Sequence, residues 1–176
     1  MKTIILLLSL ISIGMADEFF DTMLNGDYKK AEKIAIEKCN KGDGIKCALL
    51  MDWYREGIKE EKLFKDKVII HKNPYKVKEY AKKACNYGIA DGCMELGGIY
   101  SKGDIVKYDP QKAVELYIKA CEMKKGLNFL GCYNAGVQYY NLNHLPEAKK
   151  YFGLACDKGY KEGCKMYKKI STKGIK

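Results

Sequence analysis

The eight cysteines of the chain fall into four pairs at regular intervals, and this feature constrains the fold more than any other. The pairs are Cys39 with Cys47, Cys85 with Cys93, Cys121 with Cys132, and Cys156 with Cys164. Three pairs are separated by eight residues and the third pair by eleven. An even number of cysteines on a regular interval predicts a disulfide framework built on an internal repeat. The spacing favours bonds within each pair, although eight cysteines allow about a hundred connectivities.

The N-terminus indicates that these cysteines meet an oxidising compartment. A basic start precedes an uncharged run rich in Ile and Leu over residues 3–15, and Gly14 and Ala16 supply the small residues of a cleavage site. This three-part pattern predicts a secretory signal peptide over residues 1–16, with cleavage after Ala16. The apolar run has about 13 residues, fewer than the roughly 20 needed to cross a bilayer. We therefore expect a mature chain without a membrane span, periplasmic or secreted.

The charge of the chain comes almost entirely from lysine. The formal net charge is +10, from 32 Lys and Arg against 22 Asp and Glu, and Arg55 is the only arginine. Lysine is a hydrated point charge and lacks the planar fork with which arginine recognises phosphates and bases. The excess is therefore predicted to be a solvated surface, and no nucleic-acid partner is expected.

The residues before the first cysteine of each pair follow a helical period. Positions eight, five, four and one before it are apolar, apart from Lys38, and these spacings define one helical face. These positions hold Ala31, Ile34 and Ala35 before Cys39; Val77, Tyr80, Ala81 and Ala84 before Cys85; Ala113, Leu116, Tyr117 and Ala120 before Cys121; and Ala148, Tyr151, Phe152 and Ala155 before Cys156. A glycine then predicts a left-handed helix end. It lies three residues after the cysteine as Gly42, Gly88 and Gly159, and five residues after it as Gly126.

The second cysteine of each pair opens a second predicted helix. Tyr54, Tyr100 and Tyr139 lie seven residues after this cysteine in the first three repeats. Ser171 takes the position in the fourth repeat, on a lysine-rich face. We expect most of the tyrosines to pack between repeats. A polar outer face is what the terminal repeat of an array needs, so the fourth repeat is predicted to cap the array.

The composition predicts an all-α protein, because helix formers are abundant, only three prolines occur and strand-like alternation is scarce. Residues 17–176 are expected to form a single domain. Its repeats are predicted at about 27–57, 75–103, 110–141 and 146–174. Asp109 and Pro110 predict the N-cap and the first residue of a helix. Residues 58–74 form an extended connector that interrupts the repeat and has no assigned role.

The repeat resembles a known family. The pattern Ala-X-X-X-Tyr-X-Lys-Ala-Cys, a Gly-containing turn, Cys-X-X-Leu-Gly-X-X-Tyr and Gly-Asp-X-Val-X-X-Asp is similar to Sel1-like repeats, most clearly from Tyr80 to Ala113. With its cysteines, the chain resembles the secreted cysteine-rich Sel1-repeat proteins of Helicobacter and Campylobacter type over about residues 27–172. The resemblance implies an α/α solenoid, a TPR-like superhelix, in which each disulfide joins the two helices of its own repeat. The implied disulfides are Cys39–Cys47, Cys85–Cys93, Cys121–Cys132 and Cys156–Cys164. The extended connector and the stretched third turn depart from the family pattern.

The resemblance also implies an activity, because some members of this family have been described as penicillin-binding proteins or weak β-lactamases. A serine enzyme of that type needs Ser-X-X-Lys, Ser-Asp-Asn and Lys-Thr-Gly. Neither Ser101 nor Ser171 has a lysine three residues later, Ser-Asp-Asn is absent, and Thr172-Lys173-Gly174 has the wrong order. The β-lactamase therefore stays an alternative that rests on resemblance, and no catalytic residue is identified.

Other chemistry finds little support in the residues. A catalytic zinc site needs a cluster of histidines, and the chain has only His71 and His144. Structural zinc sites use closer cysteines than these, and a fully paired set leaves no free thiol for a nucleophile. His71 in the extended connector is considered as a general base, although a lone loop histidine is usually solvated. No metal or cofactor is expected.

These observations favour a non-enzymatic binding or scaffold module that is a monomer. The expected partner is a protein, a peptide or a peptidoglycan fragment, and a secreted host-directed factor or a periplasmic inhibitor would share the fold. The candidate groove residues are Tyr80, Glu115, Tyr117, Lys119 and Tyr151. Some tyrosine hydroxyls are expected at the edge of that groove.

Overall fold

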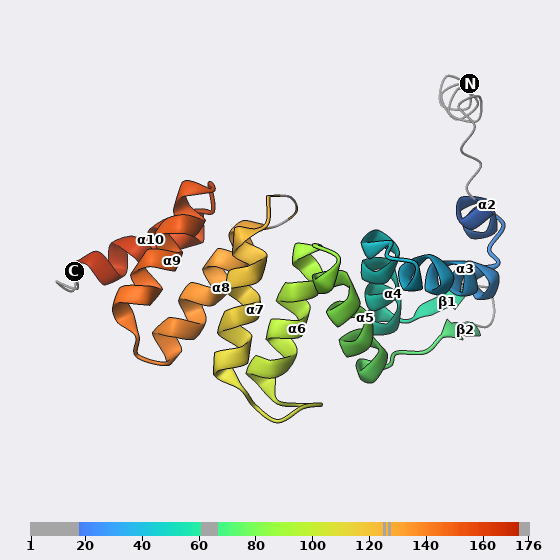
Figure 1. The fold of residues 1–176 in the computed structure, drawn as a ribbon, viewed down its shortest axis with the longest axis horizontal. Coiled ribbons are helices and arrows are strands. Elements are labelled where there is room, and N and C mark those ends of the chain that lie inside the picture. Colours follow the sequence, from blue (N-terminus) through green and yellow to red (C-terminus); the bar gives the residue numbers. More distant parts are fainter. Residues whose placement is uncertain (1–17, 61–66, 125, 127, 173–176) are drawn as a thin grey trace, which may run out of the picture.

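The computed structural model describes residues 18–60, 67–124, 126 and 128–172. The predicted signal peptide and its cleavage after Ala16 lie outside the described residues. The described part is an array of antiparallel helices that follow one another along the long axis, with α2 near one end and α10 at the other (Figure 1). The helices are α2 (Glu18–Leu24), α3 (Tyr28–Asn40), α4 (Gly44–Glu56), α5 (Pro74–Asn86), α6 (Ala90–Lys102), α7 (Pro110–Glu122), α8 (Asn128–Asn141), α9 (Leu145–Asp157) and α10 (Lys161–Ser171). The prediction of an all-α solenoid is confirmed.

The glycine turns form as the sequence predicts in three of the helix pairs. Gly42, Gly88 and Gly159 have φ of 102°, 81° and 87°. After α3, the Gly42 N–H donates to the Cys39 carbonyl at 3.0 Å, and the next N–H donates to the Lys38 carbonyl at 3.0 Å. The same two bonds recur around Gly88 and Gly159. This is the Schellman arrangement, in which a left-handed glycine satisfies carbonyls that the helix end leaves free.

The third helix pair turns differently, which explains its longer cysteine spacing. Helix α7 ends one residue after Cys121, and its C-cap Met123 is extended with ψ of 141°. The Asn128 side chain donates to the Met123 carbonyl at 2.5 Å and ties the start of α8 to the end of α7. Gly126 has a positive φ of 84°, as expected, but lies within a longer loop.

The extended connector contains a β-hairpin that the sequence analysis missed. Strands β1 (Ile58–Glu60) and β2 (Lys67–Ile70) pair in antiparallel register, with Ile58 opposite Ile70. Ile70 is 2% exposed and belongs to the main hydrophobic core. The β-branched run of Val68, Ile69 and Ile70 favours a strand. The run is too short to show the alternation of apolar and polar residues that identifies a strand. The composition of the chain therefore led to a prediction of helices only.

Each repeat packs on the next either through a pair of stacked tyrosines or through a glycine notch. In a glycine notch, a helical glycine leaves room for an aromatic ring of the next repeat. Tyr54 of α4 stacks on Tyr80 of α5 at 5.6 Å, and Tyr139 of α8 stacks on Tyr151 of α9 at 5.5 Å, measured between ring centroids. A Cβ atom on Gly97 would lie 2.7 Å from the Tyr117 ring, and one on Gly136 would lie 2.8 Å from the Phe152 ring. The expectation that these tyrosines pack between repeats is confirmed.

The N-terminal helix α2, which lies outside the predicted repeats, covers the first helix pair. Phe19 is 3% exposed and stacks on Trp53 of α4 at 6.1 Å. The Lys46 ammonium lies 4.0 Å from the centre of the Phe19 ring. The other helix pairs have a glycine at the position of Lys46, namely Gly92, Gly131 and Gly163. The first helix pair therefore accommodates a long side chain at this position, and Phe19 of α2 packs against that side chain.

Candidate functional site

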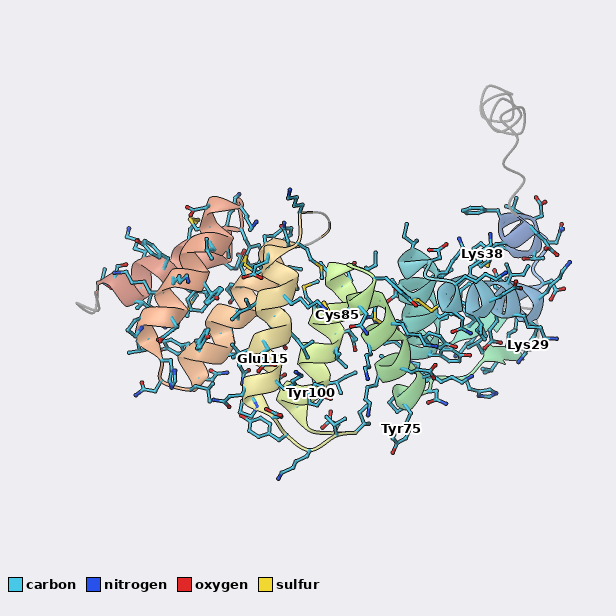
Figure 2. The ribbon with its side chains drawn as sticks, viewed as in Figure 1. Lys29, Lys38, Tyr75, Cys85, Tyr100 and Glu115 are labelled. Atoms are coloured by element: carbon cyan, nitrogen blue, oxygen red, sulfur yellow. A yellow bond between two sulfur atoms is a disulfide. The ribbon has the colours of Figure 1, made fainter. Side chains whose placement is uncertain are left out.

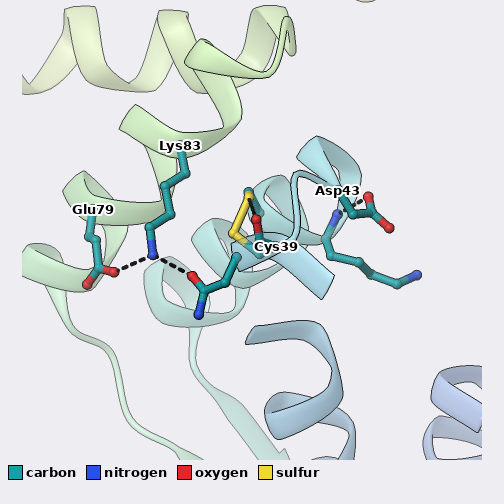
Figure 3. The surroundings of a disulfide bond; sticks show 7 residues. Cys39, Asp43, Glu79 and Lys83 are labelled. Carbon is teal, nitrogen blue, oxygen red and sulfur yellow. Dashed lines mark hydrogen bonds and ion pairs between the residues drawn. A yellow bond between two sulfur atoms is a disulfide. The ribbon is translucent and has the colours of Figure 1, made fainter. Parts of the chain in front are cut away.

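Four disulfides hold the two helices of each pair together. The structure bonds Cys39 to Cys47, Cys85 to Cys93, Cys121 to Cys132, and Cys156 to Cys164, with Cα–Cα distances of 4.9, 4.5, 4.5 and 4.5 Å. This is the pairing that the family resemblance implies, and it leaves no free cysteine in the chain. Near the first disulfide, Lys83 of α5 donates to Asn40 at 2.9 Å and to Glu79 at 2.8 Å, so α5 is also tied to the end of α3 (Figure 3).

A cavity lies along one row of helices. Helix α6 contacts α4 and α8 in addition to its neighbours in sequence, so these three helices form the closely spaced side of the array. A cavity of about 590 Å³ lies on this side. Its apolar lining comes from Tyr54, Val77, Met94, Ile99, Ile105, Tyr117 and Leu130, and its polar lining includes Asn73 and Asn134. The size falls within the usual range for ligand pockets.

The polar rim of the cavity is organised around the only arginine. The Arg55 guanidinium donates to Asp52 at 2.6 Å, to Glu56 at 3.2 Å and to Glu95 of α6 at 3.0 Å. Burial raises the pKa of Asp52, and Arg55 acts in the opposite direction. Because arginine offers several donors in one plane, a single side chain can hold acids from two successive repeats. The sequence showed that Arg55 is unique but gave no sign of its partners.

A second set of polar contacts, centred on the Tyr54 hydroxyl, links the first two helix pairs. The Tyr54 hydroxyl donates to Glu32 of α3 and accepts from the Lys76 ammonium of α5 at 2.7 Å. The same ammonium lies 4.2 Å from the centre of the Tyr54 ring. Burial is the main cause that raises the pKa of Tyr54, and the bond to Glu32 acts in the same direction. Tyr54 therefore joins three helices while its ring lines the cavity.

The candidate groove residues do not gather in one place. Tyr117 lines the large cavity, whereas Tyr80 and Tyr151 are stacked between repeats. Glu115 is exposed on α7 (Figure 2), pairs with Lys112 at 2.8 Å and borders a separate cavity of about 320 Å³. Lys119 is exposed on α7.

The sequence analysis placed the groove on the helix before each disulfide, while most of the lining of the large cavity comes from the helix after it. Residues such as Met94, Ile99 and Leu130 carry no chemical signature of their own. A count of exposed apolar positions on the second helices is the signal that could have found them.

The residues considered for catalysis occupy ordinary positions. The Ser101 hydroxyl donates to the Gly98 carbonyl at 3.0 Å and lies 3.4 Å from the Tyr117 hydroxyl. His71 is exposed at the end of the hairpin, and His144 stacks on Tyr139 at 6.1 Å. Within the described ranges, His, Cys, Asp and Glu side chains form no group of three or more that could hold a metal ion. None of the helices described is long and apolar enough to span a bilayer.

Comparison with known proteins shows which repeat family the helix array resembles. The Sel1 repeat model matches residues 90–125 and 127–160. Helicobacter pylori cysteine rich protein B has a similar structure, with a TM-score of 0.55 and 28% identity over 80% of this chain and 94% of that chain. Two further structures share the fold at lower identity.

One is a Sel1 repeat protein from Oxalobacter formigenes, with a TM-score of 0.59 and 17% identity over 78% of this chain and 51% of that chain. The other is a protective antigen of uropathogenic Escherichia coli strains, with a TM-score of 0.61 and 24% identity over 81% of this chain and 30% of that chain. Cytochrome c oxidase assembly factor 7 of Mus musculus is 31% identical over 87 residues, or 44% of this chain. The chain spans 37% of the length of that relative.

The matched repeats divide the array one helix out of step with the cysteine pairs. Each matched unit starts at or one residue before the second helix of one pair, α6 or α8, and ends after the first helix of the next, α7 or α9. The Cys121–Cys132 disulfide therefore joins the two matched units, although it lies within one helix pair. Residues 90–125 and 127–160 match the Sel1 repeat, and with the helix array and the four disulfides the chain resembles the cysteine-rich Sel1-like repeat family.

Proposed function

We propose that the protein is an exported interaction module that binds an extended segment of another polypeptide in the cavity along α4, α6 and α8. The observation that carries this proposal is the cavity of about 590 Å³, which has an apolar lining and a charged rim. Ligand sites typically combine these two features, because apolar area supplies affinity and a few polar groups fix orientation. Solenoids present such extended surfaces to their partners.

The frame around the cavity supports the same proposal. Disulfides hold the helix pairs, and the stacked tyrosines and glycine notches hold one pair against the next. A site held rigid before binding loses less conformational entropy when it binds its ligand. Rigidity of this kind favours recognition of a flexible segment by a preformed surface.

Export is the second part of the proposal. All eight cysteines are bonded, and disulfides persist in oxidising compartments such as the periplasm and the exterior. The N-terminal sequence predicts a signal peptide, which agrees with this chemistry. Fractionation of the native cells with thiol labelling tests it, and a reduced protein in the cytoplasm would contradict export.

Peptide display against the oxidised protein tests the binding function. Selected peptides are added to ¹⁵N-labelled protein, and the expected amide shifts lie on α4, α6 and α8. Ile105→Glu places a charge in the cavity from a loop position and should weaken binding at least about tenfold. Tyr108→Glu is the matched control, because Tyr108 is in the same loop and 55% exposed.

Two results would contradict the proposal. One is binding that Ile105→Glu leaves unchanged while its melting curve matches that of the wild type. The other is steady hydrolysis of nitrocefin by repurified, oxidised protein, which would favour the β-lactamase that the family resemblance implies.

A further inference from the structure

The fourth disulfide is less well buried than the other three. Cys156 and Cys164 are partly exposed, whereas each of the other six cysteines is at most 4% exposed. Those six belong to hydrophobic clusters of the core, and Cys156 and Cys164 belong to none of the clusters among the described residues. A thiol reagent reacts with a disulfide only where it can reach the sulfur atoms, so this difference in burial predicts a difference in reactivity.

The packing of successive helix pairs explains the difference. Tyr160, in the turn between α9 and α10, packs against the cluster that contains the third disulfide. Ile89 lies at the equivalent position, four residues after the first cysteine of its pair, and packs against the cluster that contains the first disulfide. A turn of the following pair therefore covers the disulfide before it. In the described part of the chain no helix pair follows α10, and Lys165 and Lys168 leave its outer face polar and exposed.

Helix α10 also has fewer packing partners than the inner helices. It packs mainly on α9, whereas α8 packs on both α7 and α9. Near its C-terminal end, Ile170 is buried with Ala148 and Phe152 of α9. The disulfide is the covalent link at its other end, where Cys164 is the fourth residue of the helix. Without this bond, packing on α9 is the main contact that holds α10 to the array.

We propose that Cys156–Cys164 is a thiol–disulfide exchange site, at which a dithiol reductant opens the bond and frees α10 while the other three disulfides stay intact. One thiolate of the dithiol attacks Cys156 Sγ, the S–S bond breaks, and Cys164 leaves as a thiolate that takes up the proton given up by the dithiol. The N-terminal turn of α10 stabilises the negative charge on this sulfur. The second thiol then attacks the mixed disulfide, which releases Cys156 as a thiol and leaves the dithiol oxidised to a disulfide.

The expected consequence is local opening of the array. A disulfide stabilises mainly by restricting the unfolded state of the segment that it closes, so its loss makes opening of α10 more frequent. Opening uncovers Ala148 and Phe152, which are 0% exposed while α10 is in place. The cavity of the proposed function is lined by residues up to Asn134 of α8, so the exchange site goes beyond that function and does not depend on it.

Limited reduction of the oxidised full chain tests the site. Dithiothreitol is the reductant, excess iodoacetamide stops the reaction at intervals, and peptide mass spectrometry locates the alkylated cysteines. Cys156 and Cys164 should be alkylated at least about tenfold faster than the other six cysteines. Cys85 and Cys93 are the internal control, because they have the same separation in the sequence but are buried. Equal rates at the four pairs, or a faster reaction at another pair, would overturn the proposal.

Hydrogen exchange tests the release of α10. After selective reduction and alkylation, the amides of α10 should exchange about 10- to 100-fold faster, and those of α4, α5 and α6 should be unchanged. The variant Cys156→Ser with Cys164→Ser lacks the alkyl groups and should give the same pattern, because loss of the bond alone causes it. Unchanged exchange in α10, or faster exchange throughout the array, overturns the release in either sample.

Discussion

The backbone N–H of Asn73 donates to the carbonyl oxygen of Tyr54 at 2.8 Å. The same bond joins Asp109 to Tyr100 at 3.0 Å and His144 to Tyr139 at 2.9 Å. In each case the N-cap residue of one helix is fixed to the tyrosine near the end of the helix before it. The three connectors differ greatly in length, and the first contains the hairpin, yet all return to the same anchor. Insertion at this place therefore leaves the stacking of the helices intact.

Loss of a disulfide should destabilise the protein strongly. Closing a loop of about nine residues restricts the unfolded chain by about 2.6 kcal/mol on the loop-entropy model. Cys85 and Cys93 are 1% and 0% exposed, so replacing both by alanine also removes buried contacts. We expect Cys85→Ala with Cys93→Ala to lower the free energy of unfolding by about 2–5 kcal/mol in urea. Excess reductant should lower the melting temperature of the wild type, and an unchanged curve would refute the structural role.

A methyl group in the notch at Gly97 should be costly, although alanine favours helices. The added Cβ would lie 2.7 Å from a carbon of the Tyr117 ring, which is itself packed. Gly97→Ala is expected to destabilise by about 1–3 kcal/mol through overpacking. The neighbouring Gly98→Ala is the matched control, because its Cβ would meet only the Tyr117 hydroxyl at 3.8 Å. It should stabilise by about 0.5–1 kcal/mol through helix propensity. Equal effects of the two variants in chemical denaturation would argue against the notch.

The Tyr54 hydroxyl should contribute to stability through its two partners. Tyr54→Phe leaves the half-buried Glu32 carboxylate without its donor and removes the acceptor of Lys76. We expect a loss of about 1–3 kcal/mol in the free energy of unfolding. Tyr100→Phe is the control, because Tyr100, like Tyr54, lies seven residues after the second cysteine of its pair, and its hydroxyl makes no hydrogen bond to a described residue. A loss in Tyr100→Phe as large as that in Tyr54→Phe would contradict this assignment.

Alkaline pH should unfold the protein because buried tyrosines resist ionisation. Burial raises the pKa of Tyr54, Tyr80, Tyr117 and Tyr151 above the ordinary value near 10. Below that value both states are protonated and the stability is complete. As the pH rises through about 10, tyrosines of the unfolded chain ionise first, so the free energy of unfolding falls.

Urea unfolding between about pH 8.5 and 11, with absorbance at 295 nm to follow tyrosinate, measures this dependence. Tyr117→Phe should flatten the decline, whereas Tyr75→Phe, at a side chain 68% exposed, should not. A decline of the same slope in Tyr117→Phe and the wild type would show that Tyr117 makes no contribution.

Local signals made much of the fold predictable. The N-cap at Asp109 is confirmed by its bond to the Lys112 N–H at 2.9 Å, and the glycine after Cys85 is left-handed as expected. Both features depend on a few consecutive residues. The lining of the cavity was harder to predict, because the charged candidates Glu115 and Lys119 lie on an exposed face of α7 and do not line it. A charged face on one helix does not reveal which helices of the array lie close enough to form a cavity.

Helical periodicity and turn chemistry act over a few residues, so the amino-acid sequence was enough to predict the helix pairs, the Asp109 N-cap, the glycine helix ends and the tyrosines that join the repeats. Helix packing, in contrast, sets three features: α4, α6 and α8 line the cavity, Arg55 bridges two repeats, and the segment after the hairpin brings Lys72 to the cavity. These features depend on residues far apart in the chain. Their separation is fixed by how the helices pack, and no local pattern records that distance.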